Sequence, residues 1–370
     1  YGAYLGNVDF TNAIIRNTDF ACVDNFTAEQ LYSTLSYKNK DLTGISLLSN
    51  NLNGWNFNGQ NLTNADFYYA TLTNADFSNA TVKGAGFLYT VSKGFTEAQL
   101  KSTKSYQDKD LSGINLGSND LSGWNFYGQN LTNASFWCAT LTNADFSNAT
   151  VNGADFRGTV SEGFTEAQLE STNSYKAKDL SGINLGRNDL SGWYFYGQNL
   201  TNASFEGATL TDANFADATL TNVNFADATV KGADFRGTVS KGFTEAQLKS
   251  TKSYQDKDLS GIGLGSNDLS GWYFSVQNLT NASFEGATLT DASFYYANLT
   301  NANFENATFG GTNFTNADTT NASFAGTATK GLTRSQLEAA KNGMTNIILS
   351  NNDFATAGWS FDGADLTNTK

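Results

Sequence analysis

The chain has no histidine and no proline among its 370 residues, and it has only two cysteines. Without histidine it lacks the side chain that most often serves as a general base or a metal ligand. Without proline, no residue removes a backbone donor from a strand ladder. Two cysteines cannot form a disulfide framework. Cys22 and Cys138 are also too distant in a repetitive chain for us to expect a bridge within it.

The sequence also lacks a long apolar run and an excess of positive charge. No run of about 18 apolar residues is present, so we expect no transmembrane helix. Lys and Arg total 22 against 35 Asp and Glu, a net charge of −13. Such a surface repels phosphate backbones and anionic membranes, which argues against nucleic acid and membrane insertion. The charge either keeps a long rod soluble or faces a basic partner.

The first residue is Tyr1 rather than methionine, and it lies next to a repeat. No signal peptide is visible. This start favours a processed protein that is extracellular or attached to the cell surface, with a cytoplasmic protein as the alternative.

What the sequence does have is repetition. "LTNADFSNAT" occupies residues 72–81 and returns unchanged at residues 141–150. Large apolar residues recur every five positions, and a small residue stands two positions before each regular one, as Ala75 stands before Phe77. Neither the period of a strand nor that of a helix fits this spacing. A short fixed period indicates one elongated solenoid rather than several globular domains.

This pattern resembles the pentapeptide-repeat family, whose signature is A-(D/N)-(L/F)-x-x. The stretches "ADFSN" from Ala75 and "ADLTN" from Ala364 match it, and similar fives cover most of the chain. The resemblance implies an all-β fold, a right-handed, four-sided parallel β-solenoid with four pentapeptides per coil. It also implies a single continuous domain over residues 1–370. The central Leu or Phe and the small residue point inward.

The alternation of Leu and Phe has a physical consequence inside a four-sided tube. A close-packed interior requires a small residue wherever a large one fills the middle. With four fives per coil, Phe should stack on two opposite faces, and Leu or Val on the other two. Successive coils should lie about 4.8 Å apart, the spacing of strands in a sheet.

Five interruptions share one signal, "FTAEQL" or a close variant. Thr96 and Gln99 fit a capping box, and Phe95 and Leu100 fit a hydrophobic staple. The signal predicts short helices near residues 26–36, 95–105, 164–174, 243–253 and 332–342. Helices of this length are marginal alone, so they must dock on the solenoid. The signals are 69, 69, 79 and 89 residues apart, which indicates a larger repeat extended by ten residues at a time.

An unusual coil follows each of the first four helices. Its small-residue positions hold large residues, including Trp124, which cannot occupy the space of an alanine. We therefore expect this coil to open locally and its tryptophan to cover the preceding helix. The aromatic residues expected to dock the helices are Trp55, Trp124, Trp193, Trp272, Phe95, Phe164 and Phe243. The alternative is a row of exposed tryptophans that stacks on sugars or another flat ligand. Trp137 lies outside this series and should face solvent.

No catalytic constellation is apparent, so we expect neither an enzyme nor a bound cofactor or metal. No histidine is available to activate a serine or cysteine. The recurring outward acids are interpreted as corner residues rather than as a glycosidase pair; they are Asp66, Asp76, Asp145, Asp155 and Asp234. Thr-x-Thr triplets such as Thr71/Thr73 resemble ice-binding faces, but they do not persist from one coil to the next.

The two ends favour a function. A terminal coil without a cap leaves unpaired backbone groups over an apolar interior. We find no cap at either end, so we expect the assembly contacts to involve Tyr1, Tyr4, Leu5, Phe361 and Leu366. Two different adhesive ends make a head-to-tail contact that continues as a filament. The leading interpretation is therefore a structural rod that binds copies of itself.

Two alternatives remain open. Some pentapeptide-repeat proteins are acidic mimics of duplex DNA that bind type II topoisomerases, and the net charge permits this. Against it, those relatives dimerise through a C-terminal helix, whereas here strand-like sequence follows the last helix signal. The other alternative is a flat solenoid surface that binds ice or glycans.

Overall fold

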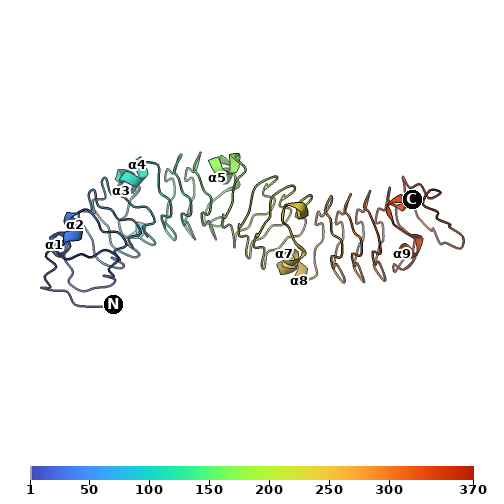
Figure 1. Ribbon diagram of the computed structural model, residues 1–370, viewed down its shortest axis with the longest axis horizontal. Helices are drawn as coiled ribbons and strands as arrows, with labels where there is room; N and C mark the ends of the chain where they lie inside the picture. The colour runs from blue at the N-terminus through green and yellow to red at the C-terminus, as the bar shows by residue number, and fades with distance from the viewer. Residues whose placement is uncertain (1) are drawn as a thin grey trace. The chain divides into compact units, whose positions relative to one another are not determined.

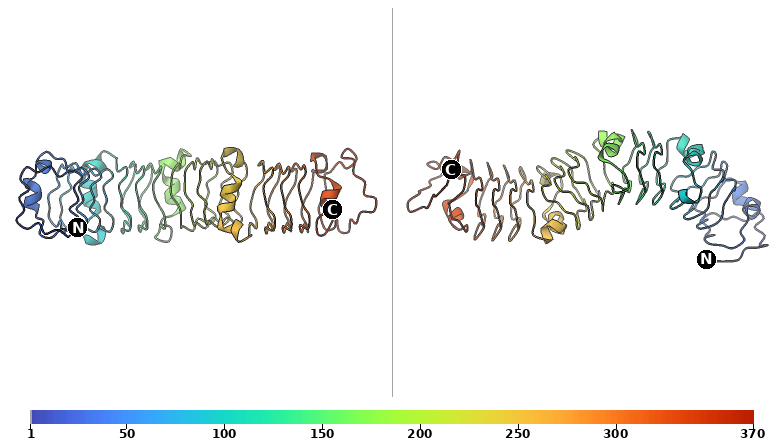
Figure 2. Two further views of the ribbon diagram at one scale, coloured as in Figure 1. Left: turned by 60° about the horizontal axis from the view of Figure 1, so that its bottom comes forward. Right: turned by 180° about the vertical axis from the view of Figure 1, so that it is seen from behind.

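The computed structural model describes residues 2–370 and contains two compact units, one ending at Leu185 and the other Gly186–Lys370. In each unit the chain winds into stacked coils (Figures 1 and 2). Isolated parallel bridges join residues 20 positions apart, as in Asn56 with Asp76 and Asn278 with Asn298. The predicted four-sided solenoid with four pentapeptides per coil is therefore confirmed. The single continuous domain over residues 1–370 stays a prediction.

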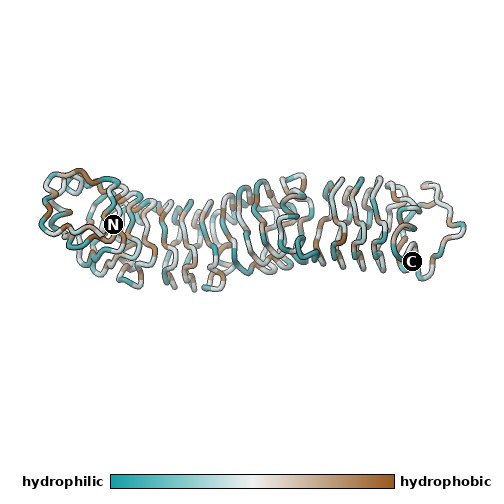
Figure 3. Tube along the Cα trace, turned by 90° about the horizontal axis from the view of Figure 1, so that it is seen from below, coloured by the Kyte–Doolittle hydropathy of each residue, from teal (hydrophilic) through white to brown (hydrophobic). Residues whose placement is uncertain are grey.

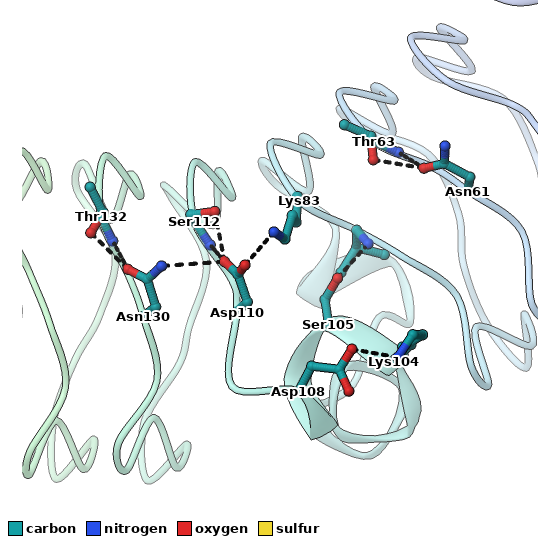
Figure 4. A network of polar contacts seen from close by, with 11 residues as sticks. Asn61, Thr63, Lys83, Lys104, Ser105, Asp108, Asp110, Ser112, Asn130 and Thr132 are labelled. Atoms are coloured by element: carbon teal, nitrogen blue, oxygen red, sulfur yellow. Dashed lines mark hydrogen bonds and ion pairs between the residues drawn. The ribbon is translucent and has the colours of Figure 1, made fainter.

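The corners explain the polar letters of the repeat. The second residue after the central one adopts a left-handed backbone, as in Asn64 (φ 57°) and Asn74 (φ 58°). Asn, Asp and Gly tolerate this conformation best. The residue before the central one often accepts a hydrogen bond from a backbone N–H two residues later, as the Asn130 Oδ1 does from Thr132 at 3.1 Å (Figure 4). The outward positions are thus largely set by turn geometry.

The interior is a ladder of apolar side chains. Along the chain, hydrophobic residues recur at short intervals in each coil (Figure 3). Phe57 and Phe77, one coil apart, are stacked with ring centroids 5.2 Å apart. Phe67 meets Phe57 edge to face at 5.5 Å from the opposite side of the tube. Leu62 and Ala65 beside them are 0% and 1% exposed. The predicted stacking of Phe is confirmed.

Short helices occupy all five interruptions. Their bounds are α1 (Ala28–Ser33), α2 (Leu35–Lys38), α3 (Glu97–Ser102), α4 (Lys104–Gln107), α5 (Glu166–Ser171), α6 (Asn173–Lys176), α7 (Glu245–Ser250), α8 (Lys252–Gln255) and α9 (Arg334–Glu338). One-turn 3-10 helices precede three of them, at η1 (Val91–Lys93), η2 (Val239–Lys241) and η3 (Ala328–Lys330). The capping box forms in each interruption, as predicted.

The sequence-based boundaries need one correction: the first four interruptions contain two helices each. Thr103 ends α3 in an extended conformation (φ −68°, ψ 149°), and its side chain then accepts a hydrogen bond from Tyr106 N–H to start α4. Thr34, Thr172 and Thr251 do the same. Ala340 stands at this position in the fifth interruption, which has α9 alone.

Each interruption lengthens one coil and leaves the ladder in register. Bridge partners are 20 positions apart in regular coils but 29 apart across the second, third and fourth insertions, as in Gly86 with Asn115. In unit 2 the last two helix signals, at Phe243 and Leu332, are 89 residues apart. This separation equals four coils of 20 residues plus the nine residues that the fourth insertion adds. Because whole coils separate them, α7–α8 and α9 lie on the same face of unit 2.

Candidate functional site

The features that depart from the plain repeat gather where each helix docks. Phe95 precedes α3 and is 1% exposed, and Trp124 from the following coil is 8% exposed. Their ring centroids lie 6.1 Å apart. We call each insertion, together with the tryptophan-bearing coil that follows it, a module. The first and fourth modules repeat the contact at 5.6 Å (Phe26 with Trp55) and 6.0 Å (Phe243 with Trp272). Phe164 is 1% and Trp193 is 7% exposed.

The coil that carries each tryptophan does not open, contrary to the expectation from the sequence. Leu121 N–H and Phe126 N–H, on either side of Trp124, donate to the next coil at 2.9 and 2.7 Å. The tryptophan fits because the insertion replaces the strand that would otherwise lie before it. Since Trp55, Trp124, Trp193 and Trp272 are only 7–8% exposed, they cannot form an exposed row for a flat ligand.

Two helices satisfy the backbone groups that the missing strand would have paired. In the second module the Asn125 N–H donates to Glu97 Oε1 at 2.7 Å, and the Asn125 carbonyl accepts from the Tyr106 hydroxyl at 2.8 Å. In the fourth module Glu245 and Tyr254 bind Tyr273 in the same way. The first module uses two tyrosines, Tyr32 and Tyr37, on Asn56. Burial raises the pKa of Tyr37 to about 12, so its hydroxyl stays a donor at ordinary pH.

The capping glutamine has a second role that sequence reasoning missed. Gln99 Oε1 accepts from Thr96 N–H at 2.8 Å, which closes the capping box. Its Nε2 donates to the carbonyls of Leu72 and Ala75 at 2.9 and 2.8 Å, which ties α3 to the coil beneath. The same two-sided role is filled by Gln30, Gln168 and Gln247.

Replacing Gln99 with leucine is expected to lower the free energy of unfolding by about 2 kcal/mol, because four side-chain hydrogen bonds are lost and two carbonyls lose a donor. Urea unfolding followed by circular dichroism measures this. Gln107→Leu is the matched control, since Gln107 is exposed and its side chain makes one hydrogen bond, to the Ser102 carbonyl at 3.2 Å. Equal effects of the two substitutions would show that Gln99 does not dock the helix.

Ion pairs join the chain segments that enter and leave an insertion. Lys83 precedes the second insertion and pairs with Asp110, which follows α4 (Figure 4). Lys231 and Asp258 pair in the same way around the fourth. Burial alone would raise the pKa of Asp110, but hydrogen bonds from Lys83 and Ser112 outweigh it and the pKa is lowered. A lowered carboxyl pKa stabilises the fold above the unfolded-state pKa, and this contribution is lost as the pH falls through the folded-state value.

The helix of the fifth module was predicted from the sequence, but its tryptophan was not recognised. "GWSF" at residues 358–361 matches "GWNF" at residues 123–126, so Trp359 belongs to the tryptophan series. It was missed because two extra residues separate it from the preceding central residue, Phe354. In this module Leu332 replaces the docking Phe. Arg334 stands at the position of Glu97, but it donates from Nη1 to the Ser360 carbonyl at 2.6 Å, whereas Glu97 accepts from the Asn125 N–H. An open cavity of about 540 Å³ lies between α9 and Trp359.

Comparison with known families gives the identity of the repeat. The chain matches the family described as pentapeptide repeats. Eight copies match, within residues 41–80, 110–148, 125–160, 179–215, 199–237, 268–306 and 297–328. These matches cover more than half of the chain. The protein belongs to the pentapeptide repeat family. Its fold is accordingly the right-handed quadrilateral β-solenoid of that family, interrupted by helical insertions.

Solved pentapeptide repeat proteins are similar to this chain at low identity. HetL, involved in heterocyst differentiation regulation in the cyanobacterium Nostoc sp. strain PCC 7120, is 21% identical, with 78% of this chain and 93% of HetL covered and a TM-score of 0.17. QnrB1, a plasmid-mediated fluoroquinolone resistance protein, is 14% identical over 71% of this chain and 89% of its own, with a TM-score of 0.22. No curated protein matches the chain.

The terminal coils of this pentapeptide repeat protein expose apolar side chains that regular coils bury. The central Leu5 is half-buried, and Tyr4, at the outward position beside it, is 66% exposed. At the other end Leu366 is 39% exposed and Phe361 is half-buried. Tyr1, also expected at an assembly contact, lies outside the described residues.

The outward acids of the repeat close corner turns. Each accepts a hydrogen bond from a backbone N–H two residues later, at 2.9–3.0 Å, in Asp66, Asp76, Asp145, Asp155 and Asp234. Within residues 2–370, no group of three or more Cys, Asp or Glu is arranged to hold a metal ion. No helix in that range is long and apolar enough to cross a membrane.

Proposed function

We propose that this protein is a non-enzymatic structural subunit whose solenoid stacks head to tail on further copies. The observation that carries the proposal is the exposure of the first coil. Gln30 docks on Leu5 as Gln99 docks on Leu72, so the two leucines are equivalent. Leu72 and Phe67 of regular coils are 0% exposed, whereas Leu5 and Phe10, which hold such central positions in the first coil, are half-buried. Burial of this apolar surface favours a contact with another coil.

The backbone of the first coil supports the same contact. In a regular coil the Asp66 N–H donates to the Ile45 carbonyl at 2.8 Å, and the Asp66 carbonyl accepts from Leu47 N–H at 2.7 Å. Asp9 and Ile14 hold corresponding positions, and their backbone groups make no hydrogen bond within residues 2–370. Unpaired strand edges of this kind favour pairing with another chain.

The other end of the chain offers a second apolar surface. Phe354, Trp359 and Phe361 form a half-buried cluster, with ring centroids 5.0–6.0 Å apart. Leu366 is 39% exposed, although central leucines of regular coils such as Leu131 are 0% exposed. Because the two ends differ, a contact between them is heterologous, and repeated contacts of this type extend into a filament.

Replacing Ile14 with aspartate is expected to reduce this assembly, because a charge in the contact would have to be desolvated. Electron microscopy and sedimentation velocity of the purified protein at increasing concentration measure it. Val276→Asp is the control, since Val276 is also exposed (47%) but lies far along the chain, on a side face of unit 2. Wild-type protein that stays as dispersed single particles at high concentration would refute the proposal.

We propose further that the assembly lies outside the cell or on its surface, which cell fractionation tests.

The DNA-mimic alternative predicts a different result: dispersed protein should inhibit the supercoiling reaction of a type II topoisomerase. Helical insertions interrupt the faces that such a mimic needs, which favours the structural function. Inhibition by dispersed protein, without assembly, would favour the mimic instead.

A further inference from the structure

Four large side chains lie exposed near one another on one face of unit 2, and we call them the tyrosine strip. They are Tyr273, Val276, Tyr295 and Tyr296, which are 57%, 47%, 40% and 53% exposed. Tyr273 and Val276 flank the buried Phe274. Tyr295 and Tyr296 follow Phe294 on the next coil, since Tyr273 bridges to Ser293 and Val276 N–H donates to the Tyr295 carbonyl at 2.8 Å. The rings of Tyr295 and Tyr296 meet edge to face, with centroids 4.5 Å apart.

Two residues of the strip occupy corner positions that suit other residue types. Val276 and Tyr296 have left-handed backbones, with φ of 58° and 55°. A bulky or β-branched side chain is strained in this conformation. At the same distances after the module tryptophan, the three earlier modules have only Gly, Asn or Asp, namely Gly59, Gly128, Gly197, Asn79, Asn148 and Asp217. Turn geometry therefore does not account for these two side chains, and a strained backbone of this kind motivates a functional hypothesis.

A cavity of about 490 Å³ opens beside Tyr296 and supplies polar groups. Its lining includes Tyr296, Asn298, Asn316, Asp318 and Lys341. Lys341 Nζ lies 3.0 Å from Asp318 Oδ2, so the two charges offset each other. Asn298 is held in place, because its Oδ1 accepts from the Thr300 N–H and hydroxyl at 3.1 and 2.7 Å.

Helical insertions bound the strip at both ends. On one side Tyr254 of α8 donates its hydroxyl to the Tyr273 carbonyl at 2.7 Å. On the other side Lys341, which follows α9, donates its N–H to the Ala317 carbonyl at 2.9 Å. The strip therefore occupies the coils between two insertions, a surface of fixed length with aromatic rings at its centre and polar side chains at one end.

We infer that the tyrosine strip and its cavity bind a neutral oligosaccharide. Exposed tyrosine rings offer apolar faces on which sugar rings can stack, together with hydroxyls that form hydrogen bonds. The amides of Asn298 and Asn316 and the paired Asp318 and Lys341 offer partners to sugar hydroxyls. The acidic chain repels polyanions, and the paired charges in the cavity leave no unpaired carboxylate there to attract a basic peptide. This inference does not depend on assembly.

Titration calorimetry with cellohexaose, chitohexaose and maltohexaose tests the inference. Wild-type protein is expected to bind at least one of them, and Tyr296→Gly should weaken that binding about tenfold, because an aromatic contact is lost. Glycine suits the backbone of this corner, so the melting temperature of Tyr296→Gly should not fall below that of the wild type. Tyr127→Ala is the control, since Tyr127 is similarly exposed (49%) but lies in unit 1.

Three results would overturn the inference. They are the absence of binding to all three hexasaccharides at millimolar concentration, binding that Tyr296→Gly leaves unchanged, and binding of an oligolysine peptide in place of the sugars. Sedimentation velocity on the same samples reports assembly separately. A failure of the head-to-tail proposal can therefore be distinguished from a failure of this one.

Discussion

Replacing Phe215 with alanine is expected to lower the free energy of unfolding by about 3–5 kcal/mol, the usual cost of removing a buried aromatic side chain. Phe215 is 0% exposed. Its ring stacks on Phe195 and Phe235, with centroids 5.0 and 5.2 Å away. It also meets Phe205 and Phe225 edge to face at 5.3 and 5.7 Å. One substitution therefore removes contacts with four rings in three successive coils.

Urea unfolding and hydrogen exchange together measure this effect. In a solenoid each coil contacts only its neighbours, so the gain in exchange should be largest in the coils next to residue 215 and decline away from it. Phe215→Leu should cost clearly less than Phe215→Ala, because most of the apolar volume remains. Val276→Ala is the control at an exposed position. A uniform rise in exchange over the whole unit would contradict the local picture.

Replacing Trp124 with alanine should destabilise the protein by about 3 kcal/mol, toward the low end for a buried aromatic residue because the ring lies at the edge of the interior. Trp124 is 8% exposed and contacts Phe95, which precedes α3, and Phe126 within its own coil. Loss of the ring leaves a void between the insertion and the solenoid. Amides of α3 and α4 should then exchange faster than those of the coils.

Trp137→Ala is a matched control for this experiment. Trp137 comes from the same unit, but it is 36% exposed, in agreement with the expectation that it faces solvent. Its loss should change stability by less than about 0.5 kcal/mol, as is usual for surface positions. If the two tryptophan substitutions had the same cost, the docking role assigned to Trp124 would be wrong.

Much of the fold follows from local chemistry, and the sequence shows it. The spacing of Phe67, Leu72 and Phe77 sets which side chains enter the tube, and all three are 0% exposed. The capping boxes were equally readable, since a box needs only a threonine and a glutamine three residues apart. The second helix of each insertion was missed because Thr103 acts as a C-cap and an N-cap together, and its conformation depends on the docked insertion.

The candidate sites were harder to predict because they combine distant residues. The sequence predicted that Trp124 contacts the helix. It did not show that the ring has room because the insertion replaces a strand of the preceding coil. Trp359 was hidden by two extra residues, and the role of Gln99 in docking needs the carbonyls of Leu72 and Ala75. The tyrosines at 295 and 296 were visible in the sequence, but nothing in their spacing pointed to Asn316 or Lys341.

By itself, the sequence determined the period of the solenoid, its inward and outward residues, the places where helices begin and the family to which the chain belongs. These depend on neighbours a few residues apart, whose interactions repeat in every coil. Only the tertiary structure decided which residues meet between coils. An insertion that lengthens a coil, as between Gly86 and Asn115, changes the separation of the partners across it from 20 to 29 positions, whereas later coils again pair at 20. The exposed end at Leu5 and the cavity beside Tyr296 therefore emerge only when the coils are stacked.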